Sequence, residues 1–385
     1  MSRPRALPIA SDRAMTATAA SWTHGGGRGL AWAAKCVLDA AGIATSCVAP
    51  RIPCAGDAPS TGAERVFVER ERTRAAAAGR TLTLVDVGTT WAKRGAPALD
   101  LSALLVGSVD GRLDTGVATS LLRRVAADGV VVLPSDVRLT RTASAACRAR
   151  RLTYGFDAAA DIRGEFRRSG LDGFEIFVTT PVGSGTLVCA RPGRRAAGEM
   201  LGALAFGLAA GVPLAGALDT LSRVRDICGS MERVAEGPVT VVIDDASTGI
   251  ALAAAARDLR DAGARRVFTI LGVEGDRSPS ERGRLARAAA EFSDGIFLTV
   301  SHSRSEDPAR LALAMVEGLP DVVECELEFD RVKAVRTALL AMRAGDALLI
   351  VGLGGDATAI EVGDRLLPCD DRALVRELTG TGVPA

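Results

Sequence analysis

At 385 residues the chain is too long for one ordinary domain and suits two or three. Its 47 Lys and Arg residues nearly balance its 46 Asp and Glu residues, so charge gives no basis for binding nucleic acid or an anionic membrane. The 8 cysteines include no C-x-x-C pair and there are only 2 histidines, which argues against a disulfide framework and a histidine-rich metal site. We therefore expect a cytoplasmic protein, without a signal peptide or a membrane-spanning run.

In the first half, short aliphatic runs alternate with Ala-, Leu- and Arg-rich stretches, a pattern typical of parallel α/β architecture. We expect a first strand at Met15–Trp22 and a helix over Leu30–Ala41 that ends at Gly42. An exposed loop is predicted at Pro50–Ser60, and a buried helix around Leu201–Leu214. Further strands are predicted at Thr81–Val87, Ala103–Val106, Val130–Leu133 and Glu175–Thr179.

The alternation starts again after Val234, which predicts a second doubly wound domain with a boundary at Ala235–Pro238. Its predicted strands are Val239–Ile243, Val267–Leu271, Ile296–Val300 and Ala347–Val351, and its predicted helices are Ile250–Ala262, Ser280–Phe292, Asp307–Glu317 and Phe329–Met342. The predicted plan is a disordered segment (1–13), a P-loop-like domain (14–234) and a Rossmann-like domain (235–385), both domains with mainly parallel sheets.

A glycine cluster between the first strand and the first helix has the context that a phosphate-binding loop needs. It comprises Gly25, Gly26, Gly27, Arg28 and Gly29. Backbone N–H groups and a helix N-terminus in this position can face an anion. A working loop also uses a lysine for the β/γ-phosphates and a hydroxyl for Mg²⁺, and Arg28 and Gly29 stand in those places. A glycine-rich turn without a ligand is the competing interpretation.

The second half carries an ordered set of motifs: Gly229–Val234, Val242–Gly249, Gly272–Arg277, Thr299–Pro308, Asp330–Arg331 and Gly345–Gly352. In order and spacing this set resembles the Mur ligase family, most closely the members that form muramyl tripeptides, with cyanophycin-synthetase-like ligases second. The resemblance covers about residues 14–356, which correspond to the family's central and C-terminal domains. The family's N-terminal UDP-sugar-binding domain has no counterpart in this sequence.

The resemblance implies ATP and Mg²⁺ as cofactors. In the family, ATP phosphorylates a substrate carboxylate, and the amine of an amino acid then attacks the acyl phosphate to form an amide. The match places the family's metal-binding carboxylate at Asp86 and the conserved aspartate after the first C-terminal strand at Asp244, our candidate catalytic residue. Asp276 and Arg277 match a nucleotide-contacting pair, and Arg304 keeps the arginine of the segment that recognises the amino acid.

Other family positions carry unlike residues. The G-T-N-G-K-T loop is replaced by the glycine cluster, and a metal-binding histidine falls on Arg112, whose guanidinium offers a metal no lone pair. A carbamylated lysine has no counterpart, because no lysine lies between Lys93 and Lys333. Since phosphoryl transfer depends on positioning and charge neutralisation, these replacements predict a large loss of rate.

We therefore expect a Mur-ligase-like protein with a degraded ATP/Mg²⁺ site, weakly active or non-catalytic, that serves as a binding or scaffolding partner of a genuine ligase of its family or of itself. The alternative is an active ATP-dependent ligase that forms an amide bond on a peptide or amino-acid substrate. For single residues, simpler roles compete: a solvated loop arginine for Arg28, a turn cap for Asp86, a structural ion pair for Asp276 and Arg277, and a loop next to a helix cap for Arg304.

Overall fold

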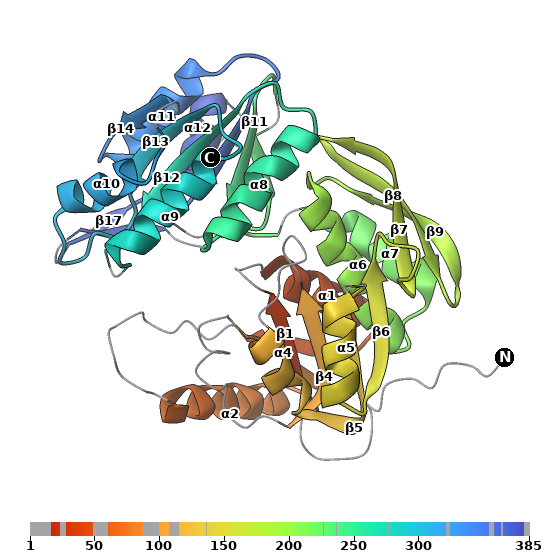
Figure 1. The fold of residues 1–385 in the computed structure, drawn as a ribbon. Helices are drawn as coiled ribbons and strands as arrows, with labels where there is room; N and C mark the ends of the chain where they lie inside the picture. The colour runs from red at the N-terminus through yellow and green to blue at the C-terminus, as the bar shows by residue number, and fades with distance from the viewer. Residues whose placement is uncertain are drawn as a thin grey trace. The chain divides into compact units, whose positions relative to one another are not determined.

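The computed structural model describes residues 17–23, 28–48, 61–87, 100–107, 115–135, 137–225, 227–235, 237–275, 277–320, 324–353, 358–362 and 365–380. The expected N-terminal segment 1–13 and the loop Pro50–Ser60 lie outside these residues. The chain divides into two compact units (Figure 1). Unit 1 comprises Met1–Arg168, Phe174–Cys189 and Ala196–Arg225; unit 2 comprises Ser169–Gly173, Ala190–Arg195 and Asp226–Ala385.

Unit 1 is built on a sheet with strand order β2-β3-β1-β4-β5-β6-β7-β8-β9. The order from β2 to β6 is parallel throughout, as the sequence predicted, whereas β8 and β9 pair antiparallel. The strands are β1 (Ala17–Thr23), β2 (Thr45–Val48), β3 (Leu82–Asp86), β4 (Leu101–Gly107), β5 (Val125–Pro134), β6 (Arg150–Gly155), β7 (Ile162–Gly170), β8 (Gly173–Thr180) and β9 (Gly183–Cys189). Aliphatic side chains of β1, β3, β4 and β5 form its buried core with Trp22.

The helices of unit 1 are α1 (Arg28–Ala40), α2 (Thr61–Ala77), α4 (Thr115–Leu122), α5 (Val137–Ala146), α6 (Arg194–Ala209) and α7 (Leu214–Arg223). The first two residues of α6, Arg194 and Arg195, belong to unit 2. Gly42 follows α1 with φ +80°, which confirms the predicted helix end, because glycine adopts this backbone conformation without strain. The predicted helix Leu201–Leu214 was wrong at its end. The chain leaves the helix after Ala209, turns at Gly211 and starts α7 after Pro213, whose ring cannot continue a helix.

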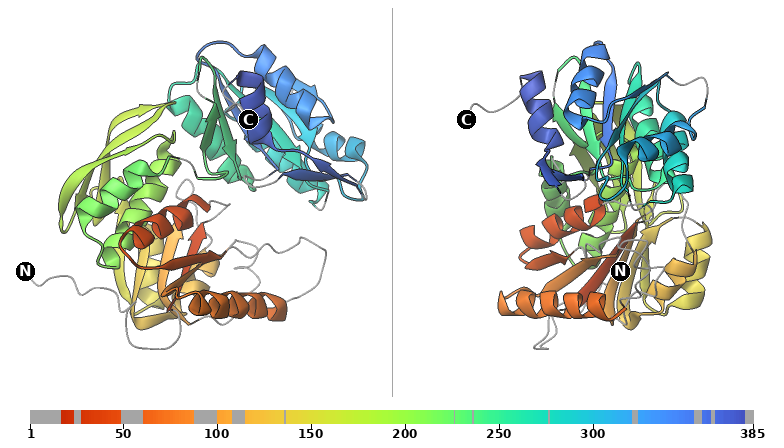
Figure 2. Two further views of the ribbon diagram at one scale, coloured as in Figure 1. Left: turned by 180° about the vertical axis from the view of Figure 1, so that it is seen from behind. Right: turned by 90° about the vertical axis from the view of Figure 1, so that its left-hand side faces the viewer.

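Unit 2 has a six-stranded sheet with order β10-β11-β15-β12-β13-β14, in which all pairs except β10–β11 are parallel. Helices α8, α9 and α10 cover one face, and α11 and α12 the other (Figure 2). The strands are β10 (Glu232–Ala235), β11 (Thr240–Asp244), β12 (Val267–Val273), β13 (Gly295–Val300), β14 (Glu324–Leu327) and β15 (Ala347–Val351). The helices are α8 (Gly249–Asp261), α9 (Pro279–Ala290), α10 (Pro308–Val316), α11 (Arg331–Ala341) and α12 (Asp371–Thr379).

The predicted elements of unit 2 are present, but the sequence did not reveal β10, β14, α12 or the hairpin of β16 (Ala359–Val362) and β17 (Arg365–Pro368). These strands are only four residues long, so they carry too few side chains for a clear alternation of buried and exposed positions. The longest segment of unit 2 runs from residue 226 to residue 385, and the domain boundary at Ala235–Pro238 stays a prediction. Among the described helices, none has the length and apolar character needed to cross a bilayer.

Candidate functional site

At the carboxyl edge of the unit 1 sheet, Asp86 ends β3 beside the end of β1. Ser21 and Asp86 are register partners in the parallel β1–β3 pair, and Ser21 Oγ donates a hydrogen bond of 3.1 Å to Asp86 Oδ1. Because the carboxyl ends of parallel strands meet at one edge, this half-buried carboxylate lies next to the start of the β1–α1 connection. Asp86 can offer an oxygen to a hard cation there.

The first turn of α1 begins directly after this connection. Gly29 is buried in the turn, and the turn itself contains no acidic residue that would offset the positive end of the helix dipole. Such a helix N-terminus suits an anion. Gly25, Gly26 and Gly27 lie outside the described residues, as does the side chain of Arg28.

Asp244, the predicted catalytic residue, ends β11 in the interior of unit 2. Its side chain is fully buried and forms an ion pair with Arg195. It also accepts hydrogen bonds from two backbone N–H groups, those of Met231 at 2.9 Å and Ala246 at 3.0 Å. Since its oxygens are taken up by neighbouring protein groups, the observed contacts hold the backbone together around the end of β11.

A second buried carboxylate, that of Asp258, positions the backbone of Arg195, the ion-pair partner of Asp244. Asp258 of α8 accepts the backbone N–H groups of Arg194 and Arg195, each at 3.0 Å, and so caps the first turn of α6. Gly193 makes this approach possible, because a Cβ there would lie 2.6 Å from the Asp258 side chain. The sequence analysis missed Arg195 and Asp258, because these residues are far apart in the sequence and no motif indicates that they meet in the folded chain.

A small crevice opens where the loops after β11, β12 and β15 meet at the carboxyl edge of the unit 2 sheet. Open α/β sheets bind ligands at such edges. Arg277 bridges two of these loops, because its Nη1 donates a 2.9 Å hydrogen bond to the carbonyl oxygen of Ser247. The predicted partner of Arg277, Asp276, lies outside the described residues. Residues that line the crevice include Ser247, Leu252, Gly272, Glu274, Arg277 and Gly352.

Arg304, the predicted substrate-binding arginine, lies on the loop after β13 and meets the β16–β17 hairpin. Its Nε is 3.4 Å from Glu361 Oε2, and its backbone N–H donates to the Glu361 carbonyl at 3.3 Å. The residue has φ +50°, which an arginine rarely adopts. The Glu361 N–H in turn donates to His302 Nδ1 at 3.1 Å. Burial lowers the pKa of His302, and Glu274 and Glu361 oppose this effect.

Asp244 at the end of β11, and Arg277 and Arg304 on the loops after β12 and β13, therefore lie at the carboxyl edge of the unit 2 sheet. Asp307 caps α10 by accepting the Ala309 N–H at 2.9 Å, as the helix-cap interpretation of this segment expected. Within the described ranges, no cluster of three or more His, Cys, Asp and Glu side chains is arranged to hold a metal ion.

The sequence comparison agrees with the motifs and the fold. Residues 230–354 match the family model described as "Mur ligase, glutamate ligase domain". The chain is therefore similar to the Mur ligase family over these residues. The UDP-N-acetylmuramoyl-L-alanyl-D-glutamate--2,6-diaminopimelate ligase of Thermosynechococcus vestitus is 33% identical over 235 residues, which are 60% of this chain and 46% of that protein. The UDP-N-acetylmuramyl-tripeptide synthetase of Roseiflexus sp. is 34% identical over 59% of this chain and 46% of its own length.

The chain spans about half the length of the curated relatives it matches. A solved structure with a similar fold is the folylpolyglutamate synthase of Mycobacterium tuberculosis in complex with ADP and AMPPCP, with TM-score 0.67 and 17% identity. That match covers 95% of this chain and 91% of the synthase. MurF from Acinetobacter baumannii has TM-score 0.62 and 15% identity, and covers 94% of this chain.

Proposed function

We propose that the chain is an ATP-dependent ligase that joins a carboxylate to an amine, with a peptide or amino-acid substrate. The observation that carries the proposal is its 33% identity, over 235 residues, to a ligase whose name describes addition of 2,6-diaminopimelate to a muramyl peptide. In this reaction the substrate carboxylate takes the γ-phosphoryl group and ADP leaves. The amine then attacks the acyl carbon, forms the amide, and releases phosphate and a proton.

The described part of unit 1 fits a bound nucleotide phosphate. The first turn of α1 has buried Gly29 and no acidic residue, and Asp86 lies beside the β1–α1 connection. We propose that Gly25, Gly26, Gly27, Arg28 and Gly29 hold the phosphates and that Asp86 supplies one oxygen to Mg²⁺. The metal would neutralise phosphate charge, which is its usual contribution to phosphoryl transfer.

In unit 2 we propose that Asp276 and Arg277 contact the nucleotide, that Arg304 binds the carboxylate of the amine substrate, and that Asp244 positions the end of β11. Arg304 can exchange Glu361 for a ligand carboxylate, because the Glu361 side chain is exposed and its Oε2 lies 3.4 Å from Arg304 Nε. Asp244 has no such freedom, because its partner Arg195 is also buried.

The second candidate function is that of a protein with the same fold that does not catalyse the ligase reaction. The replaced residues favour this function. Arg28 and Gly29 stand where a lysine and a hydroxyl are expected, and Arg112 stands where a metal ligand is expected. In addition, no lysine lies between Lys93 and Lys333. A chain of this kind would act as a binding or scaffolding partner, of a related ligase or of a second copy.

The two candidates are separated by measuring ADP and phosphate release by the purified chain with Mg-ATP, glutamyl peptides as carboxylate donors and diamino acids as amines. The ligase predicts ADP formation that needs both substrates and falls at least a hundredfold in Asp86→Asn. Thermal melting supplies the second readout, since a nucleotide at 100 times its Kd stabilises a fold by about 2.7 kcal/mol. If the chain shows no turnover and Mg-ATP does not raise its melting temperature, the ligase is rejected and the binding-partner function remains.

A further inference from the structure

Strand β14 is an end strand of the unit 2 sheet. It pairs with β13 in parallel, over the register Gly295↔Glu324 to Leu298↔Leu327, and no other described strand lies beyond it. Alternate backbone N–H and C=O groups along its outer side therefore have no strand partner within the described part of the chain. Such an edge is a template for a further strand.

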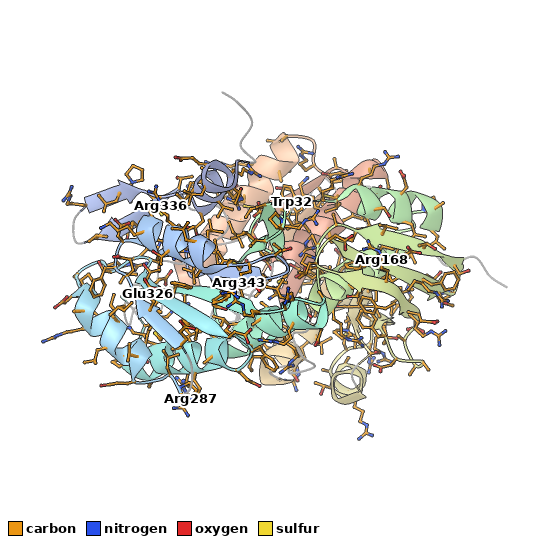
Figure 3. The ribbon with its side chains drawn as sticks, turned by 90° about the horizontal axis from the view of Figure 1, so that it is seen from above. Trp32, Arg168, Arg287, Glu326, Arg336 and Arg343 are labelled. Carbon is orange, nitrogen blue, oxygen red and sulfur yellow. The ribbon has the colours of Figure 1, made fainter. Side chains whose placement is uncertain are left out.

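The side chains of β14 are exposed along its whole length. Because successive residues point to opposite faces, Glu324 and Glu326 share one face, and Cys325 and Leu327 share the other. Glu326 can be found on β14 in Figure 3. Phe329, two residues beyond the strand, is 45% exposed and Leu327 is 43% exposed, so apolar surface continues along the edge toward α11.

The sequence around this edge is rich in acidic residues. No lysine or arginine occurs between Arg310 and Arg331. The same stretch contains Glu317, Asp321, Glu324, Glu326, Glu328 and Asp330. Arg266 interacts electrostatically with Glu324. Its guanidinium, however, forms a hydrogen bond with Asp346, in which Arg266 Nη2 lies 2.6 Å from Asp346 Oδ2. The edge therefore presents a negative field to any strand that approaches it.

We propose that the β14 edge binds an extended, basic segment of a partner protein, which adds a strand to the unit 2 sheet. Main-chain hydrogen bonds from β14 hold the segment, and its arginine or lysine side chains pair with Glu324 and Glu326. Its apolar side chains cover Leu327 on the opposite face. The glutamates hinder neutral or acidic strands and thereby select a basic one.

A second copy of this chain is a poor occupant of the same edge. Two β14 strands paired antiparallel about Cys325 would place Glu324 of each copy opposite Glu326 of the other. Like charges directly opposite each other on one face destabilise a strand pair. The charge pattern thus favours a basic partner over self-association.

The probe is a fluorescein-labelled heptapeptide that alternates arginine with valine, titrated with the full chain and followed by fluorescence anisotropy. We expect saturable binding and slower hydrogen exchange of the β14 amides in the complex. The Glu324→Gln/Glu326→Gln variant should bind about threefold to thirtyfold more weakly, the sum expected for two exposed charge pairs on a sheet. Glu165→Gln, at an exposed position of β7, is the matched control and should bind as the unchanged chain does.

Two further peptides test the strand-addition geometry. A peptide with the same charge but N-methylated at the alternate residues whose N–H groups face β14 should lose binding, because it cannot donate the ladder hydrogen bonds. Replacing its arginines by glutamates should also abolish binding. The proposal is overturned by no saturable binding, by equal binding of the N-methylated peptide, or by equal weakening in Glu165→Gln. A dimer that forms without peptide and disappears in the double variant would show that the edge pairs with itself, which also overturns it.

Discussion

Arg195 and Asp244 form a buried ion pair that joins the first turn of α6 to the end of β11. Asp244→Ala would leave the Arg195 guanidinium buried without its carboxylate partner and remove the acceptor for two backbone N–H groups. We expect a loss of about 3–5 kcal/mol in the free energy of unfolding, because removing one member of a buried ion pair is strongly destabilising. Urea unfolding, followed by circular dichroism, measures it.

Asp219→Ala is the matched control for that change. Asp219 lies on α7 in an exposed i,i+4 pair with Arg223, so its loss should change the free energy of unfolding by less than about 0.5 kcal/mol. If Asp244→Ala were as stable as this control but lost all ligase activity, Asp244 would be a catalytic residue and its bracing role would be wrong.

Two glycines at the crevice of unit 2 pack too closely for any side chain. Gly352 has φ +101°, and a Cβ on it would lie 1.9 Å from the carbonyl oxygen of Gly272. Gly352→Ala should therefore cost about 2–4 kcal/mol, from backbone strain together with overpacking. Gly216→Ala should instead stabilise the chain by about 0.5–1 kcal/mol, because Gly216 lies within α7 with open space around it. Equal melting temperatures for the two variants would contradict this packing.

Much of the fold could be predicted because long buried strands leave a strong signal. The predicted strand Ala347–Val351 matches β15 residue for residue, and all five of its side chains are buried. Gly42 marked the end of α1 correctly, since it has positive φ after the last turn. Strand β14 could not be found in this way, because all its side chains are exposed and give no periodic pattern.

The candidate site was less predictable than the fold. A motif gives the position of Asp244 and Arg304 along the chain, but not the groups that meet them in space. Arg195 lies 49 positions from Asp244, and Glu361 reaches Arg304 through a hairpin that the sequence did not reveal. Partners of this kind follow from tertiary packing, which single-sequence patterns do not contain.

His302 should make the stability of unit 2 depend on pH. Burial lowers its pKa below the ordinary value of 6.5, with Glu274 and Glu361 acting against the shift and Arg304 and Arg331 adding to it. The unfolded chain then binds a proton at a higher pH than the folded chain. The contribution of the neutral imidazole is therefore complete above pH 6.5 and is lost as the pH falls toward the folded pKa.

The variant for this test is His302→Asn, whose side-chain oxygen can still accept the Glu361 N–H that Nδ1 accepts in the unchanged chain. Urea unfolding at a series of pH values between 7.5 and 5 should show that the free energy of unfolding of the unchanged chain falls relative to that of His302→Asn as the pH is lowered. Carboxylates titrate in both proteins and cancel in the comparison. Parallel curves would mean that His302 does not titrate differently in the folded and unfolded states.

Arg331 and Asp371 form a second buried ion pair, between the first turns of α11 and α12. Arg331 donates from Nε to Asp371 Oδ1 at 2.9 Å and from Nη2 to Oδ2 at 2.7 Å, and both side chains are at least 95% buried. Arg331→Met alone should cost about 3–5 kcal/mol, because it strands the carboxylate in the interior. The double variant Arg331→Met/Asp371→Leu should recover most of this loss, since apolar groups of similar volume often replace a buried pair at little cost. A double-mutant cycle from urea unfolding gives the coupling directly, and additive losses would show that the two side chains stabilise the fold independently.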